Sequence, residues 1–112
     1  MEKEVFLNKV EEIISNTDEK YLNKYSDFIQ IEFIDSNGKN CNIELCSYFL
    51  GLMRGISLWI DSYHITDYNL TKKEYKRILT KFDNRIKEIK NSKLNNFFKA
   101  EARDNKIEKL IN

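Results

Sequence analysis

The chain lacks proline and holds only three glycines, two cysteines and one histidine among its 112 residues. Because clusters of proline and glycine mark linkers, their scarcity predicts one continuous domain without a flexible linker. Cys41 and Cys46 are too few for a disulfide framework, and their odd spacing on a strand would point them to opposite faces. A single histidine, with no glycine-rich phosphate loop and no nucleophile motif, leaves few ways to build an activated nucleophile. The sequence therefore predicts a protein that is not an enzyme and holds no cofactor.

Long hydrophobic segments are also missing. The longest apolar run, Cys46 to Ile60, is interrupted by Arg54 and falls short of the roughly 20 residues that a membrane-spanning helix needs. The first residues are charged and lead into an amphipathic stretch, unlike the apolar segment of a secretory signal. We therefore expect a cytoplasmic protein with no membrane partner. A composition rich in lysine, isoleucine and asparagine is typical of AT-rich bacterial or phage genomes.

Charge is present in both signs but is divided along the chain. Residues 1–69 carry 6 basic and 12 acidic residues, whereas residues 70–112 carry 13 basic and 6 acidic ones. The formal net charge of +1 therefore hides a dipolar molecule. A basic segment of this density attracts polyanions or an acidic surface at long range.

The amphipathic patterns predict an α+β fold that begins with a helix at residues 2–15. The apolar residues that recur there at helical spacing are Phe6, Val10, Ile13 and Ile14. Asn16 followed by Glu19 has the spacing of a capping box, which predicts a short second helix. That helix would carry Tyr21, Leu22 and Tyr25.

The clearest strand signal is a β-hairpin over residues 29–33 and 41–45, around the turn Ser36-Asn37-Gly38. A three-residue loop with Gly38 left-handed would pair Phe33 with Cys41 and keep one face wholly apolar, whereas a two-residue loop would mix apolar with polar. We expect the three-residue loop. The polar residues of the other face should meet water or a polar partner; they are Gln30, Glu32, Asn40, Asn42 and Glu44.

Residues 47–63 are apolar around most of a helical circumference, so we predict a buried central helix that covers the hairpin. Gly51 and Gly55 would be costly inside that helix, which suggests that another backbone packs closely against them. Together with an exposed strand edge, this glycine face favours a homodimer, formed by sheet extension or by helix pairing.

Thr71 begins the most sharply marked helix. Thr71 and Glu74 form a capping box, and Leu70 and Tyr75 occupy the positions of a hydrophobic staple. Because Asn91-Ser92 precedes a further helical segment, we expect one or two basic amphipathic helices at the C-terminus. The chain is therefore divided into a single α+β domain, residues 1–91, and a C-terminal helical extension, residues 92–112.

A row of basic residues on this helix is the first candidate binding surface. Lys73, Arg77, Lys81 and Arg85 are spaced by four, so their like charges would stand above one another. A nucleic acid or the acidic surface of a protein partner would relieve the repulsion; the alternative is a solvated helix face. DNA recognition usually adds base-reading side chains or exposed aromatics, but the aromatics here fall on the apolar stripe.

The second candidate lies on the expected central helix, where Arg54, Ser57 and His64 would share one face. They could hold a phosphate or carboxylate, with Arg54 binding it through two N–H groups; the alternative is that this face simply meets water. Asp61-x-x-His64-x-x-Asp67 contains metal-ligating residue types, but one histidine and two carboxylates often occur together by chance. We predict no metal site.

Small size, the charge split and the lack of catalytic motifs favour a non-enzymatic binding protein that masks a partner protein. Inhibitors, immunity proteins and anti-defence factors of phages and mobile elements act in this way. The main alternative is a nucleic-acid-binding accessory or regulatory protein that uses the basic C-terminal helix. A third hypothesis is a protein that sequesters an anionic small ligand, such as a nucleotide, at Arg54.

Overall fold

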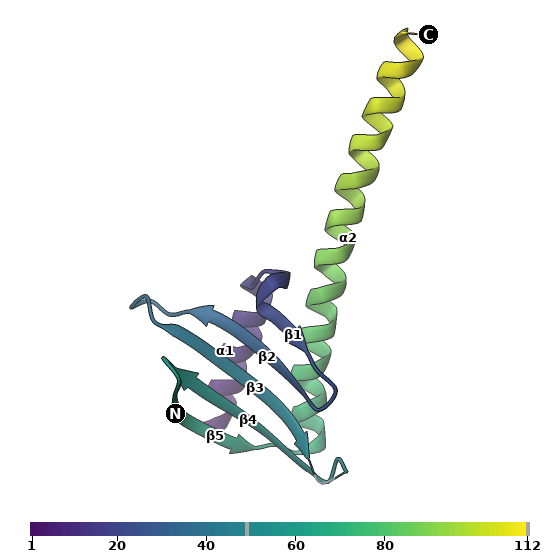
Figure 1. Cartoon of the computed structure of the whole chain (residues 1–112). Coiled ribbons are helices and arrows are strands. Elements are labelled where there is room, and N and C mark those ends of the chain that lie inside the picture. Colours follow the sequence, from purple (N-terminus) through teal and green to yellow (C-terminus); the bar gives the residue numbers. More distant parts are fainter. Residues whose placement is uncertain (49, 112) are drawn as a thin grey trace.

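Figure 1 shows the computed structural model of the chain, which describes residues 1–48 and 50–111, with side chains up to residue 96. The elements in order are α1 (Lys3–Asn16), the single 3-10 turn η1 (Glu19–Tyr21), β1 (Leu22–Lys24), β2 (Phe28–Ile34), β3 (Asn40–Tyr48), β4 (Met53–Ile60), β5 (Tyr63–Asn69) and α2 (Lys72–Ile111). The predicted α+β class is confirmed, but the sheet is larger than one hairpin.

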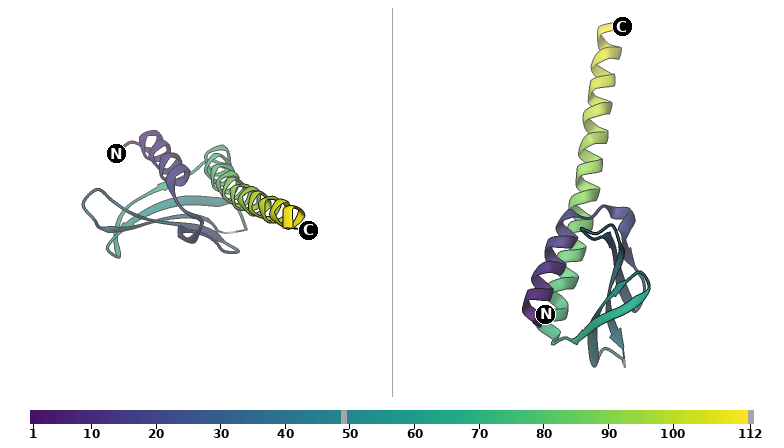
Figure 2. Two further views of the ribbon diagram at one scale, coloured as in Figure 1. Left: turned by 90° about the horizontal axis from the view of Figure 1, so that it is seen from above. Right: turned by 90° about the vertical axis from the view of Figure 1, so that its left-hand side faces the viewer.

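The strands form one five-stranded sheet in the order β1-β2-β3-β4-β5, so each strand pairs antiparallel with the next one along the chain. Short turns are enough to connect antiparallel strands that pair in chain order. In the side view, α1 and α2 lie together against one face of the sheet, and none of the described elements covers the other face (Figure 2). The described residues thus form a helix layer and a sheet layer with the core between them.

The core fills the space between the two layers. Side chains alternate between the faces of a strand, and the apolar ones point toward the helices. The helices contribute Phe6, Leu7, Val10, Ile14, Ile78 and Phe82. The sheet contributes Leu22, Ile29, Ile31, Ile43, Leu45 and Ile56. The apolar stripe predicted for residues 2–15 therefore packs on the sheet as its spacing required.

The hairpin of β2 and β3 has the predicted geometry. Phe33 pairs with Cys41, Ile31 with Ile43, and Ile29 with Leu45. Gly38 has a φ of 79°, a left-handed conformation that glycine adopts without steric cost, and its N–H donates to the carbonyl of Asp35. The three-residue loop is confirmed.

The predicted central helix at residues 47–63 is wrong, because this segment contributes the end of β3 and the strand β4. Ile56, Leu58 and Ile60 alternate with polar or half-exposed residues, which is the period of a strand with one buried face. Gly51 does not pack against a helix but turns the chain with a φ of 84°. Gly55 lies within β4, so the proposed helix-pairing surface for a dimer does not exist.

The short second helix is also wrong, since only Glu19–Tyr21 makes a helical turn and Leu22 enters β1. Asn16 does not cap it. Its side-chain amide instead donates to the Glu12 carbonyl within α1.

Helix α2 begins at the predicted residue and runs without a break through Asn91-Ser92. Neither residue interrupts a helix in the way that proline would, and one long helix therefore replaces the two that we allowed. Its second half extends beyond the sheet (Figure 1), and the described chain measures 63 Å along its longest axis. The division at residue 91 stays a prediction.

We expect Thr71→Ala to lower the free energy of unfolding by about 1 kcal/mol. The Thr71 hydroxyl accepts from the Glu74 amide at 3.1 Å, and this bond would be lost. Thr80→Ala, at an exposed position within the same helix, is the control and should leave stability unchanged or slightly higher. Equal urea midpoints for Thr71→Ala and the wild type would contradict the cap.

The other half of the capping box predicts a pH dependence. The Glu74 carboxylate accepts from the Thr71 amide and from Lys3, each at 2.9 Å, and these bonds, the backbone one first, lower the pKa of Glu74. A depressed folded-state pKa means that the stabilisation is present above the unfolded value, near 4.5, and is lost as pH falls through the folded value. Glu74→Gln should therefore reduce stability at pH 7, by about 0.3–1 kcal/mol.

In urea melts at a pH below the folded-state pKa of Glu74, the difference in stability between Glu74→Gln and the wild type should disappear. Glu88→Gln is the control, because this exposed carboxylate is held only at 3.6 Å by Arg85. A difference that persisted unchanged in acid would rule out the carboxylate charge as its cause.

Candidate functional site

The sheet face that the helices leave uncovered, hereafter the open face, is built from three rows of directly paired residues. Strand registers place Glu32 beside Asn42, Trp59 and His64 in the first row; Gln30 beside Glu44, Ser57 and Asp67 in the second; and Phe28 beside Cys46, Gly55 and Asn69 in the third. Because opposite residues of an antiparallel pair share a face, each row crosses from β2 to β5. Five residues of β2 and β3 were predicted as the wet face of a hairpin, and they lie here.

The open face is acidic and carries aromatic side chains. Glu32, Glu44 and Asp67 contribute carboxylates, and no lysine or arginine occurs in the three rows. The indole of Trp59 and the imidazole of His64 stack edge to face with ring centroids 5.1 Å apart. Such a surface offers apolar contact area together with negative charge.

Two polar atoms in the first row of the open face have no hydrogen-bond partner in the described structure: Asn42 Oδ1 and Trp59 Nε1. The two residues pair directly across β3 and β4. The Asn42 amide already donates to Glu44 at 3.2 Å, so only its oxygen is left over. An unpaired buried polar atom costs about 1–3 kcal/mol.

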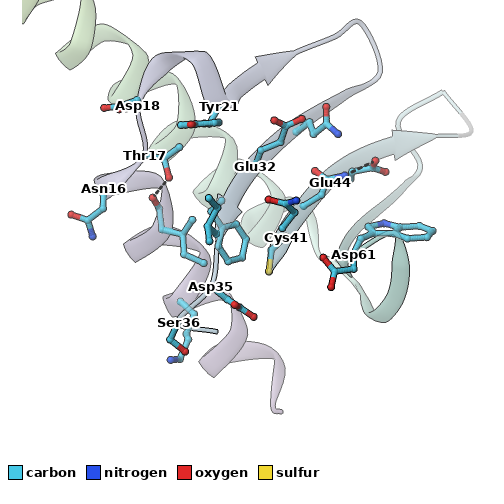
Figure 3. A pocket seen from close by; sticks show the side chains of 18 of the residues that line it. Asn16, Thr17, Asp18, Tyr21, Glu32, Asp35, Ser36, Cys41, Glu44 and Asp61 are labelled. Atoms are coloured by element: carbon cyan, nitrogen blue, oxygen red, sulfur yellow. Dashed lines mark hydrogen bonds between the residues drawn. The ribbon is translucent and has the colours of Figure 1, made fainter. Parts of the chain in front are cut away.

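A groove of about 1500 Å³ continues from the open face around the end of β2 to the C-terminal end of α1. Figure 3 shows Asn16, Asp18 and Tyr21 on one side of it and Glu32 and Asp35 on the other. We call it the acidic groove, because six of the side chains that line it are carboxylates: Glu12, Asp18, Glu32, Asp35, Glu44 and Asp61. Lys9 is the one cation among the described residues that line it.

The basic row of α2 does not line the acidic groove, and two of its four side chains are hydrogen-bonded within the chain. Arg77 donates to Glu4 at 2.7 Å, to Asn8 at 2.7 Å and to Glu11 at 2.5 Å, and the bonds to these carboxylates, Glu4 first, raise the pKa of Arg77. Arg85 donates to the carbonyl of Thr17 at 3.2 Å.

Lys73 is exposed and Lys81 is half-buried. Within the described structure neither lysine forms an ion pair with a carboxylate. The row therefore does not present four free charges. Binding by Lys73, Arg77, Lys81 and Arg85 stays a prediction.

The second predicted site, in which Arg54, Ser57 and His64 would share one face, does not form. Arg54 pairs with Ser47 on the helix-covered side, with its guanidinium 6.0 Å from the ring centre of Tyr75. Ser57 and His64 lie on the open face. On a strand, residues 54 and 57 point to opposite sides, so the three side chains do not converge as they would on a helix.

No group of three metal-ligating side chains occurs among the described residues. The cysteines lie on opposite faces, as their odd spacing predicted: Cys41 in the core and Cys46 on the open face. Burial raises the pKa of both thiols, so neither is activated as a nucleophile.

Ser57, Trp59 and Asp67 of the open face were not predicted as one surface. The alternation of Ile56, Leu58 and Ile60 with polar or aromatic neighbours was the signal that could have revealed it.

The chain matches no protein-family model, no curated protein and no solved structure in the comparisons made with them. Neither helix of the described residues carries an apolar stretch that could cross a bilayer.

We expect Arg77→Glu to destabilise the fold by more than about 1 kcal/mol, since it breaks charged hydrogen bonds and faces two carboxylates of α1. Lys73→Glu, one turn earlier on an exposed position, should change stability by no more than about 0.5 kcal/mol. Thermal and urea melts of the two variants test this, and equal stabilities would show that the Arg77 contacts contribute nothing.

Proposed function

We propose that this chain is a non-enzymatic binding protein that masks the surface of a protein partner, and that the open face is its contact surface. The observation that supports this is a five-stranded sheet with one face left bare among the described residues and with unpaired polar atoms on its strands β3 and β4. A bare sheet face of this kind is a common place for a second protein to pack.

The size of the open face suits this role. The four strands that its rows cross, β2 to β5, are seven to nine residues long and lie about 4.8 Å apart, which gives a projected area of about 500 Å². A standard protein interface buries about 800 Å² on each partner, so the open face with the adjoining acidic groove is of that order. The partly exposed Trp59 lies on β4 between β3 and β5, and tryptophan is among the residue types that contribute most to interface affinity.

The charge of the open face indicates the charge of the partner. Carboxylates without nearby cations attract a basic protein surface and speed its association. The sequence alone suggested the opposite arrangement, an acidic partner on the basic helix. We now favour a basic partner, because Arg77 and Arg85 already bind groups within the chain.

The nucleic-acid hypothesis retains one supporting observation. Lysines remain exposed along α2, namely Lys72, Lys73, Lys76, Lys87 and Lys90. They could follow a phosphate backbone without reading sequence. The anionic-ligand hypothesis has less support, since Arg54 is separated from Ser57 and His64 and the open face repels anions.

Ser57→Arg tests the proposal. The new side chain would lie between Glu44 and Asp67 in its row, reducing the negative charge of the open face and adding bulk without disturbing the core. A partner captured from a lysate of the source organism and then purified should bind this variant at least tenfold more weakly than the wild type. The Lys73→Glu variant should bind the partner with the same affinity as the wild type.

Two outcomes would contradict the proposal, and the second would favour nucleic-acid binding instead. Equal binding of the partner by Ser57→Arg and the wild type would contradict masking by the open face. A salt-dependent shift of duplex DNA that Lys73→Glu weakens and Ser57→Arg does not would assign the function to α2.

A further inference from the structure

The turn between β3 and β4 exposes apolar side chains that take no part in the described core. Leu50 is 104% exposed, Leu52 is 81% exposed and Met53 is 44% exposed. Turns usually carry glycine, asparagine, aspartate or serine, whose side chains are small or polar. We call Leu50, Leu52 and Met53 the apolar tip. The turn projects from the sheet beside the start of α2 (Figure 1).

The backbone of Leu50 is in an unfavourable conformation. Its φ of 56° lies in the left-handed region, which glycine and asparagine adopt more readily than leucine. Because the side chain is fully exposed, no burial within the chain offsets this strain. The fold of one copy therefore does not explain a leucine at this position, and strained residues of this kind are typical of sites that bind.

An apolar cavity of about 190 Å³ lies between α1 and the helix-covered side of the sheet. The apolar side chains that line it include Phe6, Val10 and Ile13 of α1 and Phe33, Leu58 and Ile60 of the sheet. Ile13, Phe33, Leu58 and Ile60 are only half-buried, so the cavity is reached from solvent. An apolar cavity of about 150 Å³ holds a benzene molecule, and this one therefore has room for a leucine side chain.

The apolar tip cannot enter the cavity of its own chain, because the two lie at opposite ends of β3 and β4. Tyr48 pairs with Met53 at the tip, whereas Cys41 pairs with Ile60 at the cavity. At about 3.4 Å per residue, these two pairs are roughly 24 Å apart. A leucine of the tip can therefore fill only the cavity of a second copy.

The charge beside the apolar tip is mostly positive. The Leu70 amide donates to the Arg54 carbonyl at 2.9 Å, which places the start of α2 next to the tip. Asp27, in the turn before β2, is an exposed carboxylate at this end. The first turns of α2 carry three exposed lysines: Lys72, Lys73 and Lys76.

The charge beside the cavity is mostly negative. The cavity and the acidic groove share lining residues, among them Ile13, Phe33 and Asp35, so the two adjoin. None of the six carboxylates of the acidic groove is within ion-pair distance of a lysine or arginine in the described structure. The two ends of the sheet are thus complementary in charge as well as in shape.

We infer that copies of this chain associate head to tail, with Leu50 of one copy in the apolar cavity of the next. Leu52 and Met53 would pack around the mouth of the cavity, and the lysines of α2 would face the acidic groove. A contact between two different surfaces leaves a tip and a cavity free at the ends, so it builds open chains or rings rather than a closed dimer. This inference goes beyond the proposed function and does not rest on it.

Sedimentation velocity of the wild type over a range of concentrations tests the inference. The mean mass should rise with concentration and pass that of a dimer. Leu50→Asn should weaken association at least tenfold, because a buried leucine is lost. Asparagine suits the left-handed backbone, so this variant should fold. Leu94→Gln is the control, since Leu94 is 51% exposed on α2 and should not contribute.

A mixture of two variants identifies both surfaces. Ile13→Trp fills the cavity with a larger side chain and leaves the apolar tip intact. Neither Ile13→Trp nor Leu50→Asn should associate alone. Their equimolar mixture should form a dimer that does not grow, because one copy supplies the cavity and the other the tip. Should Ile13→Trp fail to fold, Ile60→Lys replaces it, since a lysine at the cavity would repel the basic end of a second copy.

Three outcomes would overturn head-to-tail association. The first is a wild type that stays monomeric at every concentration, and the second is a closed dimer that Leu50→Asn and Ile13→Trp both retain. The third is binding of a monomeric wild type to vesicles of phosphatidylcholine and phosphatidylserine that Leu50→Asn abolishes, which would assign the apolar tip to a membrane. Because no partner protein is present in these measurements, their failure leaves the proposed masking function to its own test with Ser57→Arg.

Discussion

The arrangement of this molecule depends on a sheet that is apolar on one face only. Burial of Ile31, Ile43, Leu45 and Ile56 requires a covering layer, and α1 and α2 together supply it. Because both helices are needed on that side, the described chain has none left for the other. The bare open face is thus a direct consequence of how the core is closed.

The division of charge along the chain becomes a set of contacts within the fold. Helix α2, from the basic half, binds the acidic half through Arg77 with Glu4 and Glu11, and through Lys93 with Glu19. Exposed pairs of this kind contribute little individually, but the bonds of Arg77 hold the two helices side by side. The acidic groove belongs to the part of the negative half that these pairs leave uncompensated.

Unpaired polar atoms and uncompensated charge therefore lie together at one end of the sheet. In the described structure the open face has a polar donor and acceptor without partners at Trp59 and Asn42, beside the carboxylates of the acidic groove. The negative charge there is the observation that supports the proposed basic partner. A partner seated at this end would cover both features at once, without any contribution from the long helix.

The sequence by itself determined the local features. Turn chemistry at Gly38 and a period of two specified the register of Phe33 with Cys41, and the capping box at Thr71 specified where α2 begins. These depend on residues within a few positions of one another. The segment from Leu50 to Ile60 was ambiguous, because it is apolar enough for either a buried helix or a strand.

Only the tertiary structure decided that this segment is a strand, since Ile56 and Leu58 gain their burial by pairing beside Leu45 and Ile43. It also decided that Arg77 is held rather than free, through bonds to residues 66 to 73 positions away in the chain. The open face and the acidic groove follow from the same long-range pairings. Local alternation marks which residues of one strand share a face, but the pairing of strands and helices distant in sequence decides which of them lie side by side to form these surfaces.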